Sequence, residues 1–504
     1  MGTNPAASLP EADSVRAALA ACPFVVVSDG IRDTDTTAFA HVLLPAAAWG
    51  EKDGTVTNSE RRISRQRAFR PPQGQAKPDW WIVSQVAARL GWGRSFAWTK
   101  PAQIFREHAA LTRFENNGTR GLDLGPLAEL DDHDYDDLSP IQWPVGPDLE
   151  GSARLFADGR FNTPDRRARL IAVCHRAPRR QASEDFPLVL NTGRLRDQWH
   201  TMTRTGLVPR LAAHTNEPFL AIHPDDAAID GVKDGELARV TSATGSALLR
   251  VRLTPDQARG SVFAPIHWNR QFSAAGGVGS LASAETDPLS GQPEMKHTPV
   301  NVAPWQPGWR GFLVSRVRLQ PQTDYWVRTA AEGCWVYTLA GTELPADLAA
   351  WAEALTGPAA NLPAANLMEF HDTRRSLHRW VRLEGERLEA CLYLDPDGPA
   401  VPPSWLVQRF ALAEVPAEQR PWLLCDRPPD GGASGGAEAR GRIVCACMNV
   451  TEQSILTAVA DHGLTNADQV GASTEAGTNC GSCRSEITTL IERSQIEANE
   501  SPRA

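Results

Sequence analysis

Four cysteines near the end of the chain form the pattern with the clearest chemistry. One residue separates Cys445 from Cys447, two separate Cys480 from Cys483, and 32 residues lie between the pairs. Four thiolates can hold a 2Fe-2S cluster or a structural zinc ion. Structural zinc usually takes cysteines with about two to four residues between them, so the single-residue gap favours the cluster. Zinc is the alternative, and a disulfide is the least favoured because disulfides are rare inside cells.

The cysteine content as a whole does not indicate a disulfide-stabilised protein. Nine cysteines in 504 residues are too sparse for such a scaffold. The five outside the pattern are interpreted as small hydrophobic residues of buried cores: Cys22, Cys174, Cys334, Cys391 and Cys425.

The residues around the four cysteines predict helices that position them. Thr451 is placed to cap a helix that runs to about residue 460, a second short helix is expected over residues 466–470, and a third begins near Cys483. Gly481 allows backbone N–H groups to approach a sulfur, and a helix start beside an anionic cluster is favourable. The spacing resembles the bacterioferritin-associated ferredoxin family, which implies a small all-helical 2Fe-2S domain.

A second pattern suits a cofactor that carries phosphate. Residues 191–206 directly follow an apolar strand expected over residues 186–190. Thr192 and Gly193 form a turn with free backbone N–H groups, and Arg194 offers a planar fork suited to phosphate. By themselves these residues are a weak signal, since such turns are common and a histidine such as His200 is often part of a core.

The same segment resembles the dinucleotide-binding domain of molybdopterin oxidoreductases of the dimethyl sulfoxide reductase type, in particular the bacterial assimilatory nitrate reductases. Further segments follow the family's pattern across residues 1–305. They are residues 3–5, 28–29, 33–37, 42–45, 51–58, 60–62, 223–227 and 287–298. The resemblance implies two molybdopterin guanine dinucleotides that hold one molybdenum atom.

The resemblance also implies which side chains hold the two dinucleotides. One is expected at Ser28, Asp29, Lys52 and Asp79. The other is expected at Thr192, Gly193, Arg194, Gln198, Trp199, His200 and Thr201, with Lys296 nearby. A carboxylate such as Asp29 or Asp79 can accept two hydrogen bonds from guanine, and the cations can neutralise phosphates. Taken singly, Asp79 is equally well explained as the N-cap of a helix over residues 80–90, and the lysines as surface charges.

Two positions depart from the family pattern. Gly279 stands where the family often has asparagine, and His41 replaces the usual acidic residue before a strand. The family's front half carries a 4Fe-4S cluster and the molybdenum ligand, and no motif for either is present. The catalytic residue is therefore unassigned, and the abrupt start predicts a fragment that cannot complete a molybdenum site by itself.

The fold is expected to be α/β with an added β-barrel. A helix is expected over residues 11–22, strands over 24–28 and 41–45, and a hairpin of strands 236–241 and 247–253 followed by a strand over 261–266. The first expected domains are a partial molybdopterin α/β domain (1–110) and a connector (111–180), in which the acidic residues 131–137 form a solvated loop. They are followed by a double-psi-type barrel that binds the dinucleotide (181–305) and by a mixed α/β adaptor (306–427) with a hairpin near 381–394. A flexible linker (428–440), the 2Fe-2S module (441–494) and a tail (495–504) complete the chain.

The expected activity is the reduction of nitrate to nitrite by the C-terminal part of a cytoplasmic assimilatory nitrate reductase, with electrons arriving through the 2Fe-2S cluster. A net charge of -9 argues against nucleic acid as a partner, and no apolar run is long enough to span a membrane. Without a glycine-rich nicotinamide motif, the electron donor is expected to be another protein, such as a ferredoxin, a flavodoxin or an NADH-dependent reductase subunit.

Three other functions stay open on the sequence. A related molybdopterin enzyme, such as a formate dehydrogenase, would share the cofactor-binding residues. A non-catalytic electron carrier would use only the 2Fe-2S module. An interaction module would hold one structural zinc ion at the four cysteines.

Overall fold

The structure is a computed structural model that describes the chain except for residues 358–366, 397–401, 426–441 and 501–504. The expected linker at 428–440 therefore lies outside the described residues. The chain forms two compact units: residues 1–3, 23–33 and 37–177, and residues 4–22, 34–36 and 178–504. Among the described residues, no helix combines the length and the apolarity needed to cross a membrane.

The first unit combines small sheets with helices. Strand β1 (Val26–Asp29) pairs in parallel with β2 (Val42–Pro45), and β3 (Gly54–Thr57), β4 (Arg62–Gln66) and β5 (Ile141–Gln142) form an antiparallel sheet. The helices are α3 (Asp79–Ala87), α4 (Pro101–Arg113) and α5 (Asp132–Asp136), with the short turns η1 (Thr37–Phe39), η2 (Trp49–Glu51), η3 (Ala88–Trp92) and η4 (Gly125–Glu129). The core lies between α4 and η4, where Phe105 and Ala109 are packed with Leu127.

Two expectations for this unit need correction. Asp79 is the first residue of α3 and not its N-cap, because Pro78 occupies the capping position. The acidic stretch 131–137 is a short helix, α5, and not a loop. Asp131 caps it by accepting a hydrogen bond from the backbone N–H of Asp134 at 2.8 Å, and carboxylates are favoured at a helix N-terminus.

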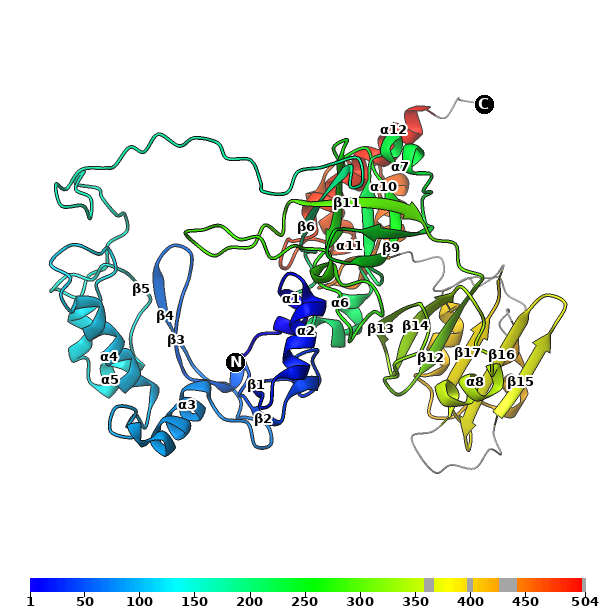
Figure 1. Ribbon diagram of the computed structural model, residues 1–504, viewed down its shortest axis with the longest axis horizontal. Coiled ribbons are helices and arrows are strands. Elements are labelled where there is room, and N and C mark those ends of the chain that lie inside the picture. Colours follow the sequence, from blue (N-terminus) through cyan, green and yellow to red (C-terminus); the bar gives the residue numbers. More distant parts are fainter. Residues whose placement is uncertain (358–366, 397–401, 426–441, 501–504) are drawn as a thin grey trace. The chain divides into compact units, whose positions relative to one another are not determined.

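The second unit contains the predicted barrel (Figure 1). Its strands close in the order β10–β6–β11–β8–β9–β7. They are β6 (Leu188–Gly193), β7 (Phe219–Ile222), β8 (Leu237–Thr241), β9 (Ser246–Leu253), β10 (Ser261–Pro265) and β11 (Thr298–Pro304), joined through η5 (Thr205–Leu207), α6 (Pro209–Ala212), α7 (Pro224–Asp230) and η6 (Val278–Ser280). The predicted hairpin is confirmed, since Thr241 of β8 lies opposite Ser246 of β9. Leu190, Val240 and Val262 fill the interior, as small barrels require.

The segment 4–22 belongs to the barrel unit and carries α1 (Pro5–Ser8) and the predicted helix α2 (Ala12–Ala21). Gly279 of η6 lies against it. A Cβ atom at this position would be 2.6 Å from the carbonyl oxygen of Ala7 and 3.1 Å from that of Leu9. The asparagine that the family often has here would therefore require the backbone to move.

Beyond the barrel, an antiparallel sheet runs in the order β13–β14–β12–β17–β16–β15. Its strands are β12 (Trp309–Ser315), β13 (Tyr325–Ala331), β14 (Cys334–Gly341), β15 (Leu367–Asp372), β16 (Leu377–Glu384) and β17 (Arg387–Leu394). Side chains alternate between two cores, so Leu313 meets α8 (Leu348–Thr356) while Phe312 meets the core of α9 (Ser404–Arg409) and η8 (Ala417–Leu424). The predicted hairpin near 381–394 is confirmed by β16 and β17.

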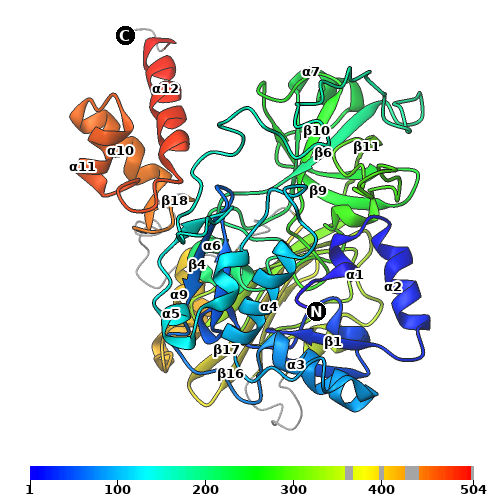
Figure 2. The same ribbon diagram turned by 90° about the vertical axis from the view of Figure 1, so that its left-hand side faces the viewer.

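The terminal module gathers three helices, α10 (Glu452–His462), α11 (Ala467–Thr474) and α12 (Arg484–Glu500), as Figure 2 shows. The predicted cap is confirmed, since the Thr451 hydroxyl accepts a hydrogen bond from the N–H of Ser454 at 3.2 Å. The all-helical expectation needs one correction. A short antiparallel ribbon of β18 (Ile443–Cys445) and β19 (Val450–Thr451) precedes the helices and positions the first cysteine.

The scattered cysteines follow the expectation only in part. Cys334 and Cys391 are buried in the sheet, as predicted. Cys22 and Cys174 are exposed and Cys425 is half-buried, so that interpretation was wrong for these three. Cys22 caps the end of α2, and Cys174 lies in an exposed segment without regular structure.

Candidate functional site

The four cysteines of the module come together as an inner and an outer pair. Cys445 ends β18, Cys447 lies in the turn that follows, and Cys480 and Cys483 precede α12. The inner pair, Cys445 and Cys483, is 2% exposed at each residue and belongs to the module core. The outer pair, Cys447 and Cys480, has its Sγ atoms 3.1 Å apart, and Cys480 is exposed to solvent.

The two pairs differ in how readily their thiols lose a proton. Hydrogen bonds to Ser482 and Cys447 lower the pKa of Cys480 to about 7. Burial, together with the hydrogen bond to Cys445, raises the pKa of Cys483 to about 11. Because metal binding requires thiolates and releases protons, Cys480 is the better prepared of these two ligands.

The arrangement of the donors fits a 2Fe-2S cluster. In such a cluster four thiolates hold two irons, so ligands that come in two pairs suit it. Gly481 has φ +72°, a conformation that favours glycine and lets the loop turn tightly between Cys480 and Cys483.

The predicted phosphate-binding loop begins where β6 ends. Thr192 donates a hydrogen bond through its hydroxyl to the carbonyl oxygen of Met295 at 2.7 Å. Lys296, 104 residues further along the chain, donates to the carbonyl oxygen of Thr192. A Cβ atom on Gly193 would lie 2.5 Å from the ring of Phe263, so a larger residue at the end of the strand would have to displace this ring. The structure thus brings three of the predicted residues together.

His267, which no sequence pattern predicted as functional, holds this loop in place. It is fully buried, accepts a hydrogen bond from the N–H of Leu195 at 2.7 Å, and has its Nδ1 atom 2.6 Å from the carbonyl oxygen of His200. Burial lowers the pKa of His267, which keeps the imidazole neutral and able to accept and donate at once. Its signal in the sequence is its place directly after the strand over residues 261–266.

Arg194, Trp199 and His200 form the exposed rim of the loop. The Arg194 guanidinium lies 5.3 Å from the centre of the Trp199 ring, and the Trp199 and His200 rings meet edge-on at 4.8 Å. Burial and the charge of Arg194 lower the pKa of His200. The rim therefore offers a cation, an aromatic face and a neutral imidazole, which suit a phosphate-linked base.

Gln198 and Thr201 use their side chains inside the protein. The Gln198 amide donates to the carbonyl oxygen of Leu211 at 3.1 Å and accepts from the Thr205 hydroxyl at 2.8 Å. The Thr201 hydroxyl accepts from the Asn4 amide at 3.2 Å. These contacts shape the loop, and a direct contact of either side chain with a ligand stays a prediction.

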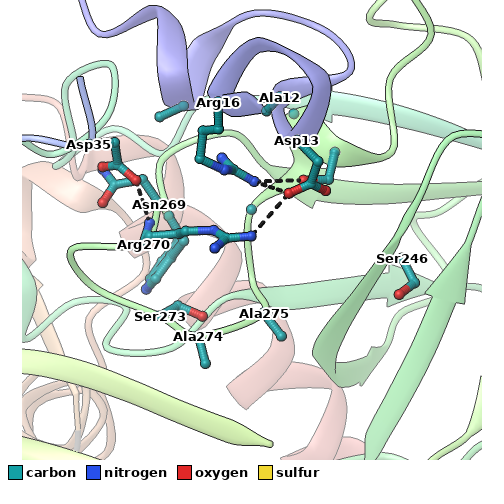
Figure 3. Close-up of a pocket in the computed structure, with 15 residues that line it drawn as sticks. Ala12, Asp13, Arg16, Asp35, Ser246, Asn269, Arg270, Ser273, Ala274 and Ala275 are labelled. Atoms are coloured by element: carbon teal, nitrogen blue, oxygen red, sulfur yellow. Dashed lines mark hydrogen bonds and ion pairs between the residues drawn. The ribbon is translucent and has the colours of Figure 1, made fainter. Parts of the chain in front are cut away.

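A small pocket lies where α2 meets the barrel loops (Figure 3). Asp13 pairs there with Arg16 and, at 3.0 Å, with Arg270, whose backbone N–H also donates to Asp35 at 2.9 Å. Asp35 is 5% exposed, and among the described residues its Oδ2 atom has no hydrogen-bond partner. Burial raises the pKa of Asp35. The pocket, of about 140 Å³, can therefore accept a hydrogen-bond donor at this oxygen.

The first unit holds the other four predicted contacts. Ser28 is 3% exposed, and its hydroxyl has no hydrogen-bond partner in the part of the chain that the structure describes. The carboxylate of Asp29 accepts from the N–H of Ile31 at 3.0 Å. The Lys52 ammonium lies 2.7 Å from the carboxylate of Asp79. The unpaired serine hydroxyl fits a polar ligand, but the lysine and the aspartate neutralise each other, which no sequence pattern indicated.

Comparison with known families matches three segments of the chain. Residues 1–89 match the family described as molybdopterin oxidoreductase. Residues 188–299 match the molydopterin dinucleotide binding domain, and residues 443–493 match the BFD-like [2Fe-2S] binding domain. The predicted resemblance is confirmed for these three segments.

Whole-chain similarity extends to longer proteins. The chain is 43% identical over 497 residues to a nitrate reductase of Klebsiella oxytoca, which covers 97% of the chain and 55% of that protein. It is 39% identical to a nitrate reductase of Shewanella frigidimarina, and this match covers 62% of the chain and 36% of that protein. It is 33% identical to the alpha subunit of a formate dehydrogenase of Methanocaldococcus jannaschii, and this match covers 60% of the chain and 42% of that protein. The chain thus spans 36% to 55% of the length of these relatives.

Proposed function

We propose that this chain is part of a molybdenum-dependent nitrate reductase, which reduces nitrate to nitrite with electrons that arrive through the 2Fe-2S cluster. The observation that carries the proposal is the succession of a molybdopterin oxidoreductase segment, a dinucleotide-binding barrel and a 2Fe-2S module in one chain. The similarity to the Klebsiella nitrate reductase runs through 97% of the chain, so it takes in all three.

In this proposal the chain's own residues bind and orient the molybdopterin guanine dinucleotides. When bound, the molybdenum cofactor supplies oxygen-atom transfer, in which nitrate, two electrons and two protons give nitrite and water. Arg194 and Lys296 neutralise phosphate charge. The exposed Trp199 ring offers an aromatic face to a base. The Ser28 hydroxyl and the Asp29 carboxylate supply hydrogen-bonding groups for guanine.

Several finer features belong to the same proposal. The reductase is assimilatory and cytoplasmic, and a further protein delivers its electrons, such as a ferredoxin, a flavodoxin or an NADH-dependent reductase subunit. In this proposal the molybdenum ligand and a 4Fe-4S cluster belong to a part of the enzyme outside these 504 residues.

A formate dehydrogenase is the second candidate. It is favoured by the 33% identity to the methanogen enzyme over 60% of the chain. The cofactor-binding residues are the same in both proposals, so substrate turnover must separate them.

The test uses the longer enzyme of which, in this proposal, the chain is a part. The purified, molybdenum-loaded protein is assayed for nitrate reduction with reduced methyl viologen and for formate oxidation with the oxidised dye. Molybdenum-dependent formation of nitrite supports the first proposal. Formate oxidation without nitrate reduction supports the second, and the absence of both reactions in molybdenum-loaded protein contradicts both.

A further inference from the structure

The barrel loop that follows β6 also contacts the 2Fe-2S module, which belongs to the same unit. Arg196 and Asp197 lie in this loop, and His214 follows α6. On the module, Arg442 precedes β18 and Glu486 lies in α12. These five charged or titratable side chains are called the docking cluster below.

Glu486 is the centre of the docking cluster. Its carboxylate lies 2.5 Å from the guanidinium of Arg196 and 3.3 Å from the Nε2 atom of His214, and it also pairs with Arg442. The other ring nitrogen of His214 lies 2.9 Å from the carboxylate of Asp197. Positive and negative groups therefore alternate across the contact between the barrel and the module.

Four of the five side chains of the docking cluster are shielded from water, and the fifth, Arg442, is 38% exposed at its edge. The side chains of Arg196, Asp197, His214 and Glu486 are 18%, 10%, 12% and 22% exposed. Burial alone would raise the pKa of Glu486, yet the hydrogen bond to His214 and the charges of Arg442 and Arg196 lower it to about 2. Exposed ion pairs contribute little to stability, whereas removing one partner of a shielded pair is costly.

Two hydrogen bonds from arginines of the barrel unit to backbone carbonyl groups of the module supplement these ion pairs. Arg196 donates a hydrogen bond to the carbonyl oxygen of Val444, next to the first cysteine. Arg210 donates to the carbonyl oxygen of Cys447 at 3.5 Å. Cys447 and Cys480 line a groove of about 1130 Å³ that is also lined by Trp199 of the barrel loop. The outer cysteine pair and the predicted dinucleotide loop thus share one groove.

We propose that the docking cluster is an interaction surface that holds the 2Fe-2S module on the dinucleotide-binding barrel. The partner of this surface is the chain's own module, and the docked position keeps Cys447 and Cys480 on the groove that Trp199 lines. The inference deepens the proposed function. It rests on that function for one point only, namely that the 2Fe-2S cluster of the docked module passes electrons to a cofactor bound to the barrel. Because opposite charges supply the attraction, high salt weakens the docking.

The test compares three proteins, each with its 2Fe-2S cluster reconstituted. They are the whole chain, its Glu486→Arg variant and a Glu492→Arg control. Glu492 is exposed on the same helix, so the control carries the same charge reversal away from the docking cluster. In Glu486→Arg the new cation faces Arg196 and Arg442 and repels them. We expect hydrogen exchange of residues 195–214 to accelerate roughly tenfold or more, and small-angle X-ray scattering to give a larger radius of gyration. The control is expected to leave both unchanged.

The visible spectrum of the cluster distinguishes undocking from misfolding, since it must be the same in all three proteins. If the Glu486→Arg protein does not take up a 2Fe-2S cluster, Arg442→Glu is used in its place, because Arg442 lies outside helix α12. Equal exchange and an equal radius in the variant and the unaltered chain would overturn the docking surface. None of these measurements needs nitrate turnover, so the docking surface and the proposed function can fail separately. If the module undocks as expected but the enzyme does not reduce nitrate, only the proposed function is contradicted.

Discussion

Identical residue types acquire different chemistry from their surroundings in the 2Fe-2S module. Cys483 is buried beside Ile487, while Cys480 is exposed and hydrogen-bonded to Ser482. Spacing alone predicts four ligands, but it does not predict which thiol is acidic, because that depends on burial and on hydrogen bonds formed after folding.

Replacing one ligand tests the assignment of the cluster. Cys480→Ser removes one of four thiolates, so we expect iron and acid-labile sulfide per chain to fall close to zero and the visible absorption of the cluster to disappear. Cys174→Ser, at an exposed cysteine outside the module, is the control and keeps the full content. A Cys480→Ser protein with undiminished iron would contradict the assignment, and one zinc with no iron in the unaltered chain would favour a zinc module.

His214 makes the docking of the module depend on pH. Burial opposes its charged form, but the hydrogen bonds to Asp197 and Glu486 outweigh burial and raise the pKa of His214 above 6.5. Arg196 and Arg442 are the cations that face the same ring. Because the docked pKa is raised, protonated His214 contributes fully below the ordinary pKa, and this contribution is lost as the pH rises through the raised pKa.

The pH dependence can be measured with the undocked variant as a reference. At each pH, the exchange of residues 195–214 is divided by the value for Glu486→Arg, which removes the intrinsic effect of pH on exchange. We expect this ratio to rise with pH in the unaltered chain and to stay level in His214→Gln. A level ratio in both proteins would show that protonation of His214 does not support docking.

At the scale of elements, the barrel is tied to a segment far from it in sequence. The amide of Asn4, just before α1, reaches Thr201 of the dinucleotide loop and accepts from Thr36 at 2.7 Å. Gly279 of η6 allows α1 to lie close to the barrel. The position of the loop therefore depends on how tightly α1 packs.

Gly279→Ala tests this packing. The added methyl group would lie 2.6 Å from the carbonyl oxygen of Ala7, so we expect a loss of about 1–3 kcal/mol in the free energy of unfolding, measured with urea. Gly277→Ala is the matched control, because its Cβ would meet only the carbonyl oxygen of Trp268 at 3.7 Å. Equal urea midpoints for the two variants would contradict the close approach of α1.

Local patterns predicted the elements whose signals are local. The turn at Thr244 and Gly245, the helix after Thr451 and the strand before Thr192 are each recognisable within about ten residues, and all three are present. Local patterns do not predict the pairing of Lys52 with Asp79 or that of Arg196 with Glu486, because the partners are 27 and 290 residues apart in sequence. The role of His267 was missed for the same reason, since its partner Leu195 comes from another strand end.

At the scale of the whole molecule, the proposed reductase should accept electrons in two ways. In the longer enzyme of which the chain is proposed to be a part, Cys480→Ser is expected to abolish nitrate reduction driven by a protein donor, since the 2Fe-2S cluster is the proposed route. Reduced methyl viologen is a small molecule that does not need this route, so nitrite formation with the dye should persist. Equal loss with both donors would contradict the assigned role of the cluster.

All four cysteines lie within residues 443–493, as do α10, α11 and the start of α12, whereas Arg196, Asp197 and His214 belong to the barrel. A gene fusion could therefore add a complete redox centre in one event, without any change to the recipient enzyme. The charges that receive the module would then be selected afterwards, one substitution at a time. In such a fusion the electron carrier would be gained in one step, whereas the barrel charges that dock it would change one at a time.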